Sequence, residues 1–219
     1  MLIADRIRQL KATLPPHVEL AAAAKTRTPE EVQTAIDAGI RVIGHNYVQE
    51  AQTMIEQLGR KAAVWTMIGH LQRNKVKVAV QLFDSIQTVD SLRLAEAIDN
   101  ECRKIGRIMS ILIEINAARE PQKSGVAPED AEDLLRQIAH LEAVRIQGLM
   151  TMGPQVSDAE LLRPIFRETK TLFDQIAVAQ IPNVSMDVLS MGMSSSYPVA
   201  IEEGATMIRL GTTVFGPRA

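Results

Sequence analysis

Short apolar runs alternate with amphipathic helical patterns along the whole sequence of 219 residues. Such runs predict buried strands, and the helical stretches between them predict parallel pairing. The expected strands cover residues 18–24, 41–45, 63–68, 83–87, 109–115, 144–151, 185–190 and 206–210. Eight strands, each followed by a helix, is the count of a closed (β/α)8 TIM barrel, an α/β fold, whereas open doubly wound sheets usually have about five or six strands.

The segments between the strands carry helix start and stop signals. Thr28 precedes Pro29 and two glutamates, which predicts a helix N-terminus there. Further helices are expected over 91–105, 158–179 and 197–203, and an extra N-terminal helix over 2–13. Because no low-complexity linker divides the chain, we expect a single domain over residues 1–219.

Composition argues against several classes of function. The net charge is −2 and basic residues are scattered, so we expect no nucleic-acid partner and no membrane partner. Cys102 is the only cysteine, which excludes an internal disulfide and predicts a cytoplasmic protein. The N-terminus reads as an amphipathic helix rather than a signal peptide. The four histidines lack the spacing of metal ligands, so we expect no metal site.

Lys25 directly follows the first expected strand. In (β/α)8 barrels the chemistry lies at the C-terminal ends of the strands. An amine held there, away from bulk water, favours its neutral form and can make a Schiff base with a carbonyl compound. The alternative is a solvated lysine at a strand end, since most lysines are exposed. Asn46 follows the second strand and is expected at the same mouth.

Hydroxyl and small residues follow the seventh strand, among them Ser190 and Ser194, and Gly211 with Thr212 follows the eighth. The loops after the last two strands are where such barrels commonly hold phosphate, through backbone N–H groups and hydroxyls. This predicts an anion-binding turn. The alternative is that Ser194 to Ser196 only cap the next helix, which needs no ligand.

Arg209 lies within the eighth strand. Alternation directs its side chain either inward, beneath a ligand ring, or outward, where Glu202 or Glu203 could pair with it. Inside the barrel the guanidinium needs a partner, and a heteroaromatic ring nitrogen can accept its hydrogen bond. Glu114 in the fifth strand points either inward beneath the ring or pairs with a lysine. An amine, an anion-binding turn and an arginine together describe a site for pyridoxal 5′-phosphate (PLP).

The chain also resembles the pyridoxal phosphate homeostasis proteins, a family related to the barrel domain of alanine racemase. The matching stretches follow the family's order and span nearly the whole chain. They are residues 24–26, 44–50, 65–75, 123–125, 148–150, 189–194 and 201–212.

The resemblance implies a carrier that holds PLP as an internal aldimine on Lys25. The other contacts it implies are Asn46 and Arg209 on the ring, and Ser194, Gly211 and Thr212 on the phosphate. Members of the family are generally regarded as non-catalytic and bind, buffer or deliver PLP. PLP-dependent acceptor enzymes would then be the partners of this chain.

Three positions depart from the family pattern. Ala24 replaces the usual serine before the lysine, and His45 replaces a glutamate. The serine loop lacks the usual aspartate before Tyr197. None of these changes removes a group assigned to the cofactor, but they alter the hydrogen bonding around it.

Two features argue against robust catalysis. Arginine can only donate, so it leaves the ring nitrogen unprotonated and weakens PLP as an electron sink. A racemase also needs a second base, which alanine racemase takes from a separate domain and its dimer. We expect no such domain here, and therefore a monomer.

Two alternatives to the carrier stay open. One is a weak amino-acid racemase that uses Lys25 with Tyr47 or His45. The other is a phosphosugar-type barrel enzyme that uses Lys25 as its Schiff-base lysine. Lys75 and Lys123 match family positions but lie at a helix start and in a polar turn, so neither is expected to be the Schiff-base lysine.

Overall fold

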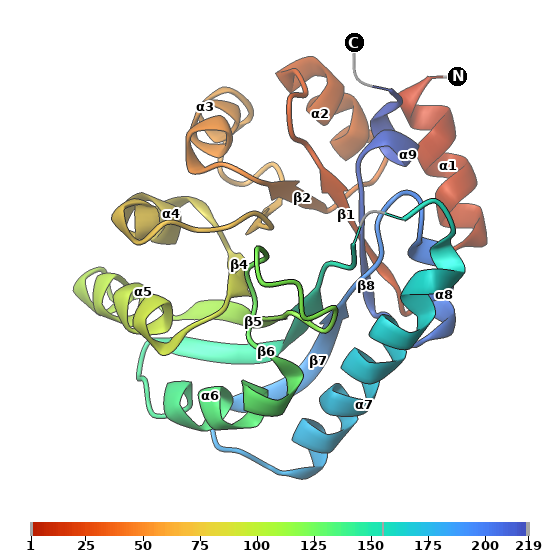
Figure 1. Ribbon diagram of the computed structural model, residues 1–219. Coiled ribbons are helices and arrows are strands. Elements are labelled where there is room, and N and C mark those ends of the chain that lie inside the picture. The colour runs from red at the N-terminus through yellow and green to blue at the C-terminus, as the bar shows by residue number, and fades with distance from the viewer. Residues whose placement is uncertain (1, 155, 218–219) are drawn as a thin grey trace.

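Eight parallel strands close into a barrel in the computed structural model, which describes residues 2–154 and 156–217 (Figure 1). Each strand pairs with the next along the chain, and the last closes the ring against the first. The strands are β1 (Glu19–Ala23), β2 (Val42–His45), β3 (Val64–Met67), β4 (Ser85–Val89), β5 (Met109–Ile115), β6 (Val144–Thr151), β7 (Val184–Ser190) and β8 (Met207–Leu210). The predicted (β/α)8 barrel is confirmed.

Helices form the outer layer around the strands (Figure 1). They are α1 (Ile3–Thr13), α2 (Pro29–Asp37), α3 (Val48–Leu58), α4 (Val76–Leu82), α5 (Leu92–Lys104), α6 (Ala131–Ile138), α7 (Arg163–Val178), α8 (Tyr197–Glu202) and α9 (Thr212–Phe215). The extra N-terminal helix is confirmed as α1, which lies against α2 and α9. In the part of the chain that the structure describes, no helix is both long enough and apolar enough to cross a membrane.

Strand β4 begins two residues later than the sequence predicts. Phe83 still belongs to the end of α4, because its N–H donates to the carbonyl of Ala79. The next carboxylate, Asp84, accepts from the N–H of Trp65 at 2.9 Å and pairs with Arg60. Pairing therefore starts at Ser85, and the strand runs on to Val89 instead of ending at 87.

The apolar core lies mainly between the strands and the helices, whereas the middle of the barrel is polar. Trp65 shows the outward parity: it is fully buried, and its indole N–H donates to the carbonyl of Arg60. Thr66, the next residue, points inward and accepts a hydrogen bond from Gln87 on the neighbouring strand β4. This division follows from the alternation of side chains along a strand, and it places polar groups beneath the mouth.

His45 is buried on the outward face of β2, which argues against the alternative in which it serves as a second base. Its ring stacks on Trp65 at 5.8 Å between centroids. Among the described residues, neither ring nitrogen has a hydrogen-bond partner. Burial lowers the pKa of His45 to about 4, so the ring is neutral at physiological pH. His45 therefore cannot supply a base inside the barrel.

Gly148 is a backbone constraint at the break in register between β6 and β7. It adopts φ +150°, and an added Cβ would lie 1.8 Å from the carbonyl oxygen of Val188. Only glycine lets the two strands approach in this way.

The burial of His45 predicts a specific acid sensitivity. The unfolded chain binds a proton near pH 6.5 and the folded chain only near pH 4, so the contribution to stability is complete above about pH 6.5 and is lost as the pH falls toward 4. The loss is about 3 kcal/mol. In His45→Phe, which keeps an aromatic ring against Trp65, urea unfolding between pH 4 and 7 should show a flatter stability profile. An unchanged profile would contradict this assignment.

Gly148→Ala is expected to lower the free energy of unfolding by about 3 kcal/mol, because it adds a clash to an unfavourable backbone conformation. Gly106→Ala is the matched control. Gly106 also has positive φ, but nothing lies within 4 Å of an added Cβ. Gly106→Ala should lower the free energy of unfolding by only about 1 kcal/mol. Thermal or urea unfolding measures both, and equal losses would show that the contact with Val188 is relieved easily.

Candidate functional site

Lys25 lies at the C-terminal mouth of the barrel, two residues after β1, the strand that is hydrogen-bonded to β8. Ala21 pairs with Arg209 and Ala22 with Leu210, so the chain reaches Lys25 beside the turn that begins at Gly211. A Cβ added at Gly211 would lie 3.6 Å from the carbonyl oxygen of Ala23, so the two residues are neighbours. The predicted amine and the predicted phosphate turn therefore occupy neighbouring strands at one end of the barrel.

The loop that carries Lys25 is anchored on both sides. Thr28 and Glu31 form the predicted capping box at the start of α2, with reciprocal hydrogen bonds of 3.3 and 2.9 Å. The Arg27 side chain is only 7% exposed and donates to the carbonyl of Gly216 just beyond α9. Thr26, which lies between Lys25 and these anchors, adopts the left-handed φ of +63°. The loop is thereby tied to the segment that follows the phosphate turn.

The half-buried amine of Lys25 is placed 5.2 Å from the ring centroid of Tyr47, in a cation–π contact. Tyr47 and Asn46 follow β2, as expected. Both line a cavity of about 310 Å3 with Gly69 and His70. Gly69 is needed there, because an added Cβ would lie 2.4 Å from the carbonyl oxygen of Asn46.

Ser194 connects the loop after β7 to the turn after β8. Its hydroxyl oxygen accepts from the backbone N–H groups of Gly211 and Thr213, each at 3.3 Å. Two N–H groups that converge on one oxygen are the arrangement that backbone anion sites use. Thr212, the residue between them, is exposed at the start of α9.

Helix capping does not explain the serines. Ser196 is the residue before α8, but its side chain makes no cap bond to that helix and instead accepts from the N–H of Met193 at 3.1 Å. Ser194 reaches across to the β8 turn rather than to α8. The capping alternative is therefore wrong for both.

Arg209 points inward, which settles the alternative left open by the sequence. It is 4% exposed and donates to the hydroxyl of Ser190 at 2.7 Å and to the carbonyl of Thr151 at 2.9 Å. Glu202 and Glu203, the suggested outward partners, instead both pair with Arg163, and Glu203 also pairs with Arg167. Burial lowers the pKa of Arg209 to about 10, which still leaves it charged at physiological pH.

Ser190 holds Arg209 rather than reaching the mouth. It is fully buried and donates to the Gln87 side-chain oxygen at 2.7 Å. Gln87 in turn donates to Thr66. Sequence reasoning assigned Ser190 to the cofactor directly and missed Gln87 and Thr66. Inward-facing polar residues at successive strands are the signal that could have revealed them.

Glu114 also points inward. Leu112, two residues earlier, lines the lower barrel cavity with Gln87 and Met207, and alternation places Glu114 on the same side. Its carboxyl is 4% exposed. Burial, and secondarily the Asp90 carboxylate, raise the pKa of Glu114 to about 7, while Arg209 opposes this shift. The pairing of Glu114 with a lysine, the other alternative, is not observed among the described residues.

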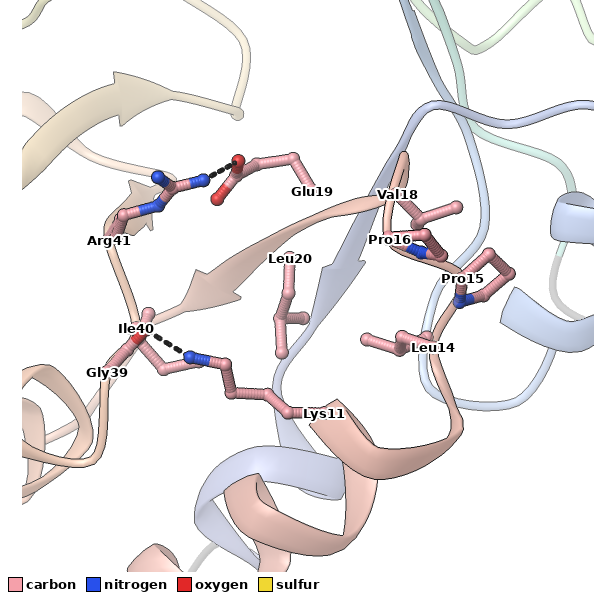
Figure 2. Close-up of a pocket in the computed structure, with 10 residues that line it drawn as sticks. All are labelled: Lys11, Leu14, Pro15, Pro16, Val18, Glu19, Leu20, Gly39, Ile40 and Arg41. Carbon is pink, nitrogen blue, oxygen red and sulfur yellow. Dashed lines mark hydrogen bonds and ion pairs between the residues drawn. The ribbon is translucent and has the colours of Figure 1, made fainter.

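A second pocket of about 340 Å3 lies at the opposite end of the barrel (Figure 2). Lys11 donates to the carbonyl of Gly39 there, and Arg41 pairs with Glu19. These residues precede or begin β1 and β2, so they lie at the N-terminal ends of the strands. In (β/α)8 barrels the residues at the N-terminal ends of the strands contribute to stability, whereas the active sites lie at the C-terminal ends.

The mouth thus combines an amine, two convergent N–H groups and a buried guanidinium that is positioned from below. This donor set fits an aromatic aldehyde that carries a phosphate. Lys25 can hold the aldehyde carbon, the Ser194–Gly211 turn the phosphate, and Arg209 a ring atom that accepts a hydrogen bond. The described residues contain no cluster of three or more His, Cys, Asp or Glu side chains able to hold a metal ion.

Comparisons with known proteins place the chain in a family. Residues 2–219 match the family model of the alanine racemase N-terminal domain. The chain is 38% identical over 200 residues to the pyridoxal phosphate homeostasis protein of Aquifex aeolicus, covering 91% of this chain and 87% of that protein. It is 38% identical over 214 residues to the protein of the same name from Synechocystis, covering 96% of each.

The solved structures agree. PipY of Synechococcus elongatus without PLP superposes with a TM-score of 0.92 at 37% identity, covering 98% of this chain and all of that chain. PipY with PLP bound gives 0.90 at 36% identity, with the same coverage. An alanine racemase of Clostridium difficile gives 0.84 at 14% identity, covering 99% of this chain and 56% of that chain, which shows a shared fold alone. The chain therefore belongs to the pyridoxal phosphate homeostasis protein family.

Proposed function

We propose that this chain binds PLP at the mouth of the barrel and serves in PLP homeostasis, by binding, buffering or delivering the cofactor without robust catalysis. The observation that carries this is the placement of Lys25 beside the Ser194–Gly211 turn on neighbouring strands, above the buried Arg209. The family relationship and the PLP-bound structure of PipY support the same cofactor.

In this proposal each group has a defined chemical task. The neutral amine of Lys25 adds to the PLP aldehyde, and loss of one water leaves the internal aldimine. The N–H groups of Gly211 and Thr213 and the hydroxyls of Ser194 and Thr212 bind the phosphate oxygens. Asn46 lines one side of the ring. Arg209 donates to the ring nitrogen and keeps it unprotonated, which weakens the cofactor as an electron sink.

The geometry supports a carrier over a racemase. A racemase needs a second base that faces the substrate from the side opposite the lysine. His45, one candidate, is buried outside the barrel against Trp65. The ring of Tyr47, the other candidate, lies against the Lys25 amine itself. A half-buried lysine at an open mouth also suits reversible exchange of the cofactor.

The setting of this function is part of the proposal. We propose one domain over residues 1–219 that acts as a monomer in the cytoplasm, where its buried free thiol, Cys102, stays reduced. PLP-dependent enzymes would be the acceptors, and they would approach the exposed mouth.

The lysine assignment predicts the outcome of three alanine variants. Purified protein loaded with PLP should absorb in the visible range of a lysine Schiff base, and Lys25→Ala should lose this band. Lys75→Ala and Lys123→Ala are the matched controls, and both should keep it. Borohydride reduction followed by peptide mapping should place the adduct on Lys25. A band that persists in Lys25→Ala would show that another lysine is used.

The carrier assignment predicts little turnover. The PLP-loaded protein should exchange α-deuterium from labelled alanine no faster than the same concentration of free PLP, because neither His45 nor Tyr47 lies where a second base opposite Lys25 is needed. Proton NMR of the alanine signal measures this directly. Exchange well above the free-PLP rate, and lost in Tyr47→Phe, would instead establish a weak racemase.

A further inference from the structure

Glu114 is a buried acid that the cofactor contacts described so far do not use. Its Oε2 atom is inaccessible to solvent and has no hydrogen-bond partner among the described residues. An unpaired carboxylate in such a place is costly, whereas the neutral acid is tolerated. The side chain therefore has a physical reason to carry a proton.

The charges around Glu114 come from opposite parts of the barrel. Arg209 approaches from β8 and Asp90 from the end of β4, while β6 contributes the uncharged Met150 at the paired position. Both N–H groups of Arg209 that make hydrogen bonds are directed to Ser190 and Thr151, not to this carboxyl. Arg209 thus offsets a negative charge on Glu114 only at a distance, and Asp90 opposes it.

Binding of PLP would change this balance in one direction. The phosphate adds negative charge at the mouth, and the ring displaces water from above the Arg209–Glu114 layer. Both changes disfavour the ionised carboxylate. Because the pKa of Glu114 already stands at about 7, a modest further rise converts it to the neutral acid at physiological pH.

We propose that Glu114 takes up a proton from solvent when PLP enters, and that this uptake makes cofactor affinity depend on pH in the neutral range. The inference rests on the proposed function and assigns Glu114 as a positioning residue beneath the ring. Affinity is highest where Glu114 is protonated in both states and falls as the pH rises above about 7. A small fall in pH would then favour retention of PLP, and a rise would favour its release.

The test compares pH profiles between variants, because the PLP phosphate also changes its charge over this range. The Kd for PLP is measured from pH 6 to 8.5 in wild type, Glu114→Gln and the control Glu96→Gln, which removes an exposed acid on α5. The Kd of wild type and Glu96→Gln should rise about tenfold more over this range than that of Glu114→Gln. Calorimetry in two buffers of different ionisation enthalpy at pH 7.5 should show proton uptake that exceeds that of Glu114→Gln by about half a proton.

Parallel Kd profiles and equal proton numbers for wild type and Glu114→Gln would overturn the inference while leaving PLP binding intact. Absence of PLP binding by wild type at every pH would overturn the proposed function itself. Should Glu114→Gln fold poorly, Glu114→Leu gives the same comparison, since an apolar side chain suits a buried site. It should also lack the steep rise in Kd.

Discussion

The hydrogen-bonded guanidinium of Arg209 in the centre of the barrel is the interaction on which the site depends. A buried charge costs several kcal/mol unless its donors are matched. Here Ser190 and the carbonyl of Thr151 accept from it, and Gln87 holds Ser190 in turn. These partners come from β4, β6 and β7, so the arginine fixes the relative positions of strands on several sides of the barrel.

This arrangement explains why β1 ends in small residues. Ala21 pairs with Arg209, and Ala23 lies beside Gly211. Larger side chains at these inward positions would enter the space above and beside the guanidinium. Because β1 ends in alanines, a space remains above Arg209. Charged and polar side chains lie at its inner end, and the Lys25 amine lies at its outer edge. Such a space binds a planar anionic molecule and contributes few further groups for chemistry.

Much of this could be predicted from the sequence, because the governing signals are local. Strand and helix alternation identified all eight strands, and Thr28 with Glu31 marked the start of α2. The parity of single residues was harder. Asp84 accepts a hydrogen bond from the N–H of Trp65, and β4 begins two residues later than the sequence predicts. Gln87, expected at the last position of this strand, lies in its middle instead. The racemase alternative uses His45 as a base, yet the alternation of side chains along β2 directs this residue outward against Trp65. Which way Arg209 and Glu114 point also depends on register across the sheet, which no single segment encodes.

The hydrogen bond from Arg27 to the carbonyl of Gly216 connects the C-terminal segment to the loop after β1. Phe215 adds to this link by lying under the same guanidinium, at 5.4 Å. Two segments almost two hundred residues apart in sequence are thus held together at the rim. Substitutions near position 216 should therefore alter the mobility of the loop that carries Lys25. The two segments are accordingly expected to evolve together.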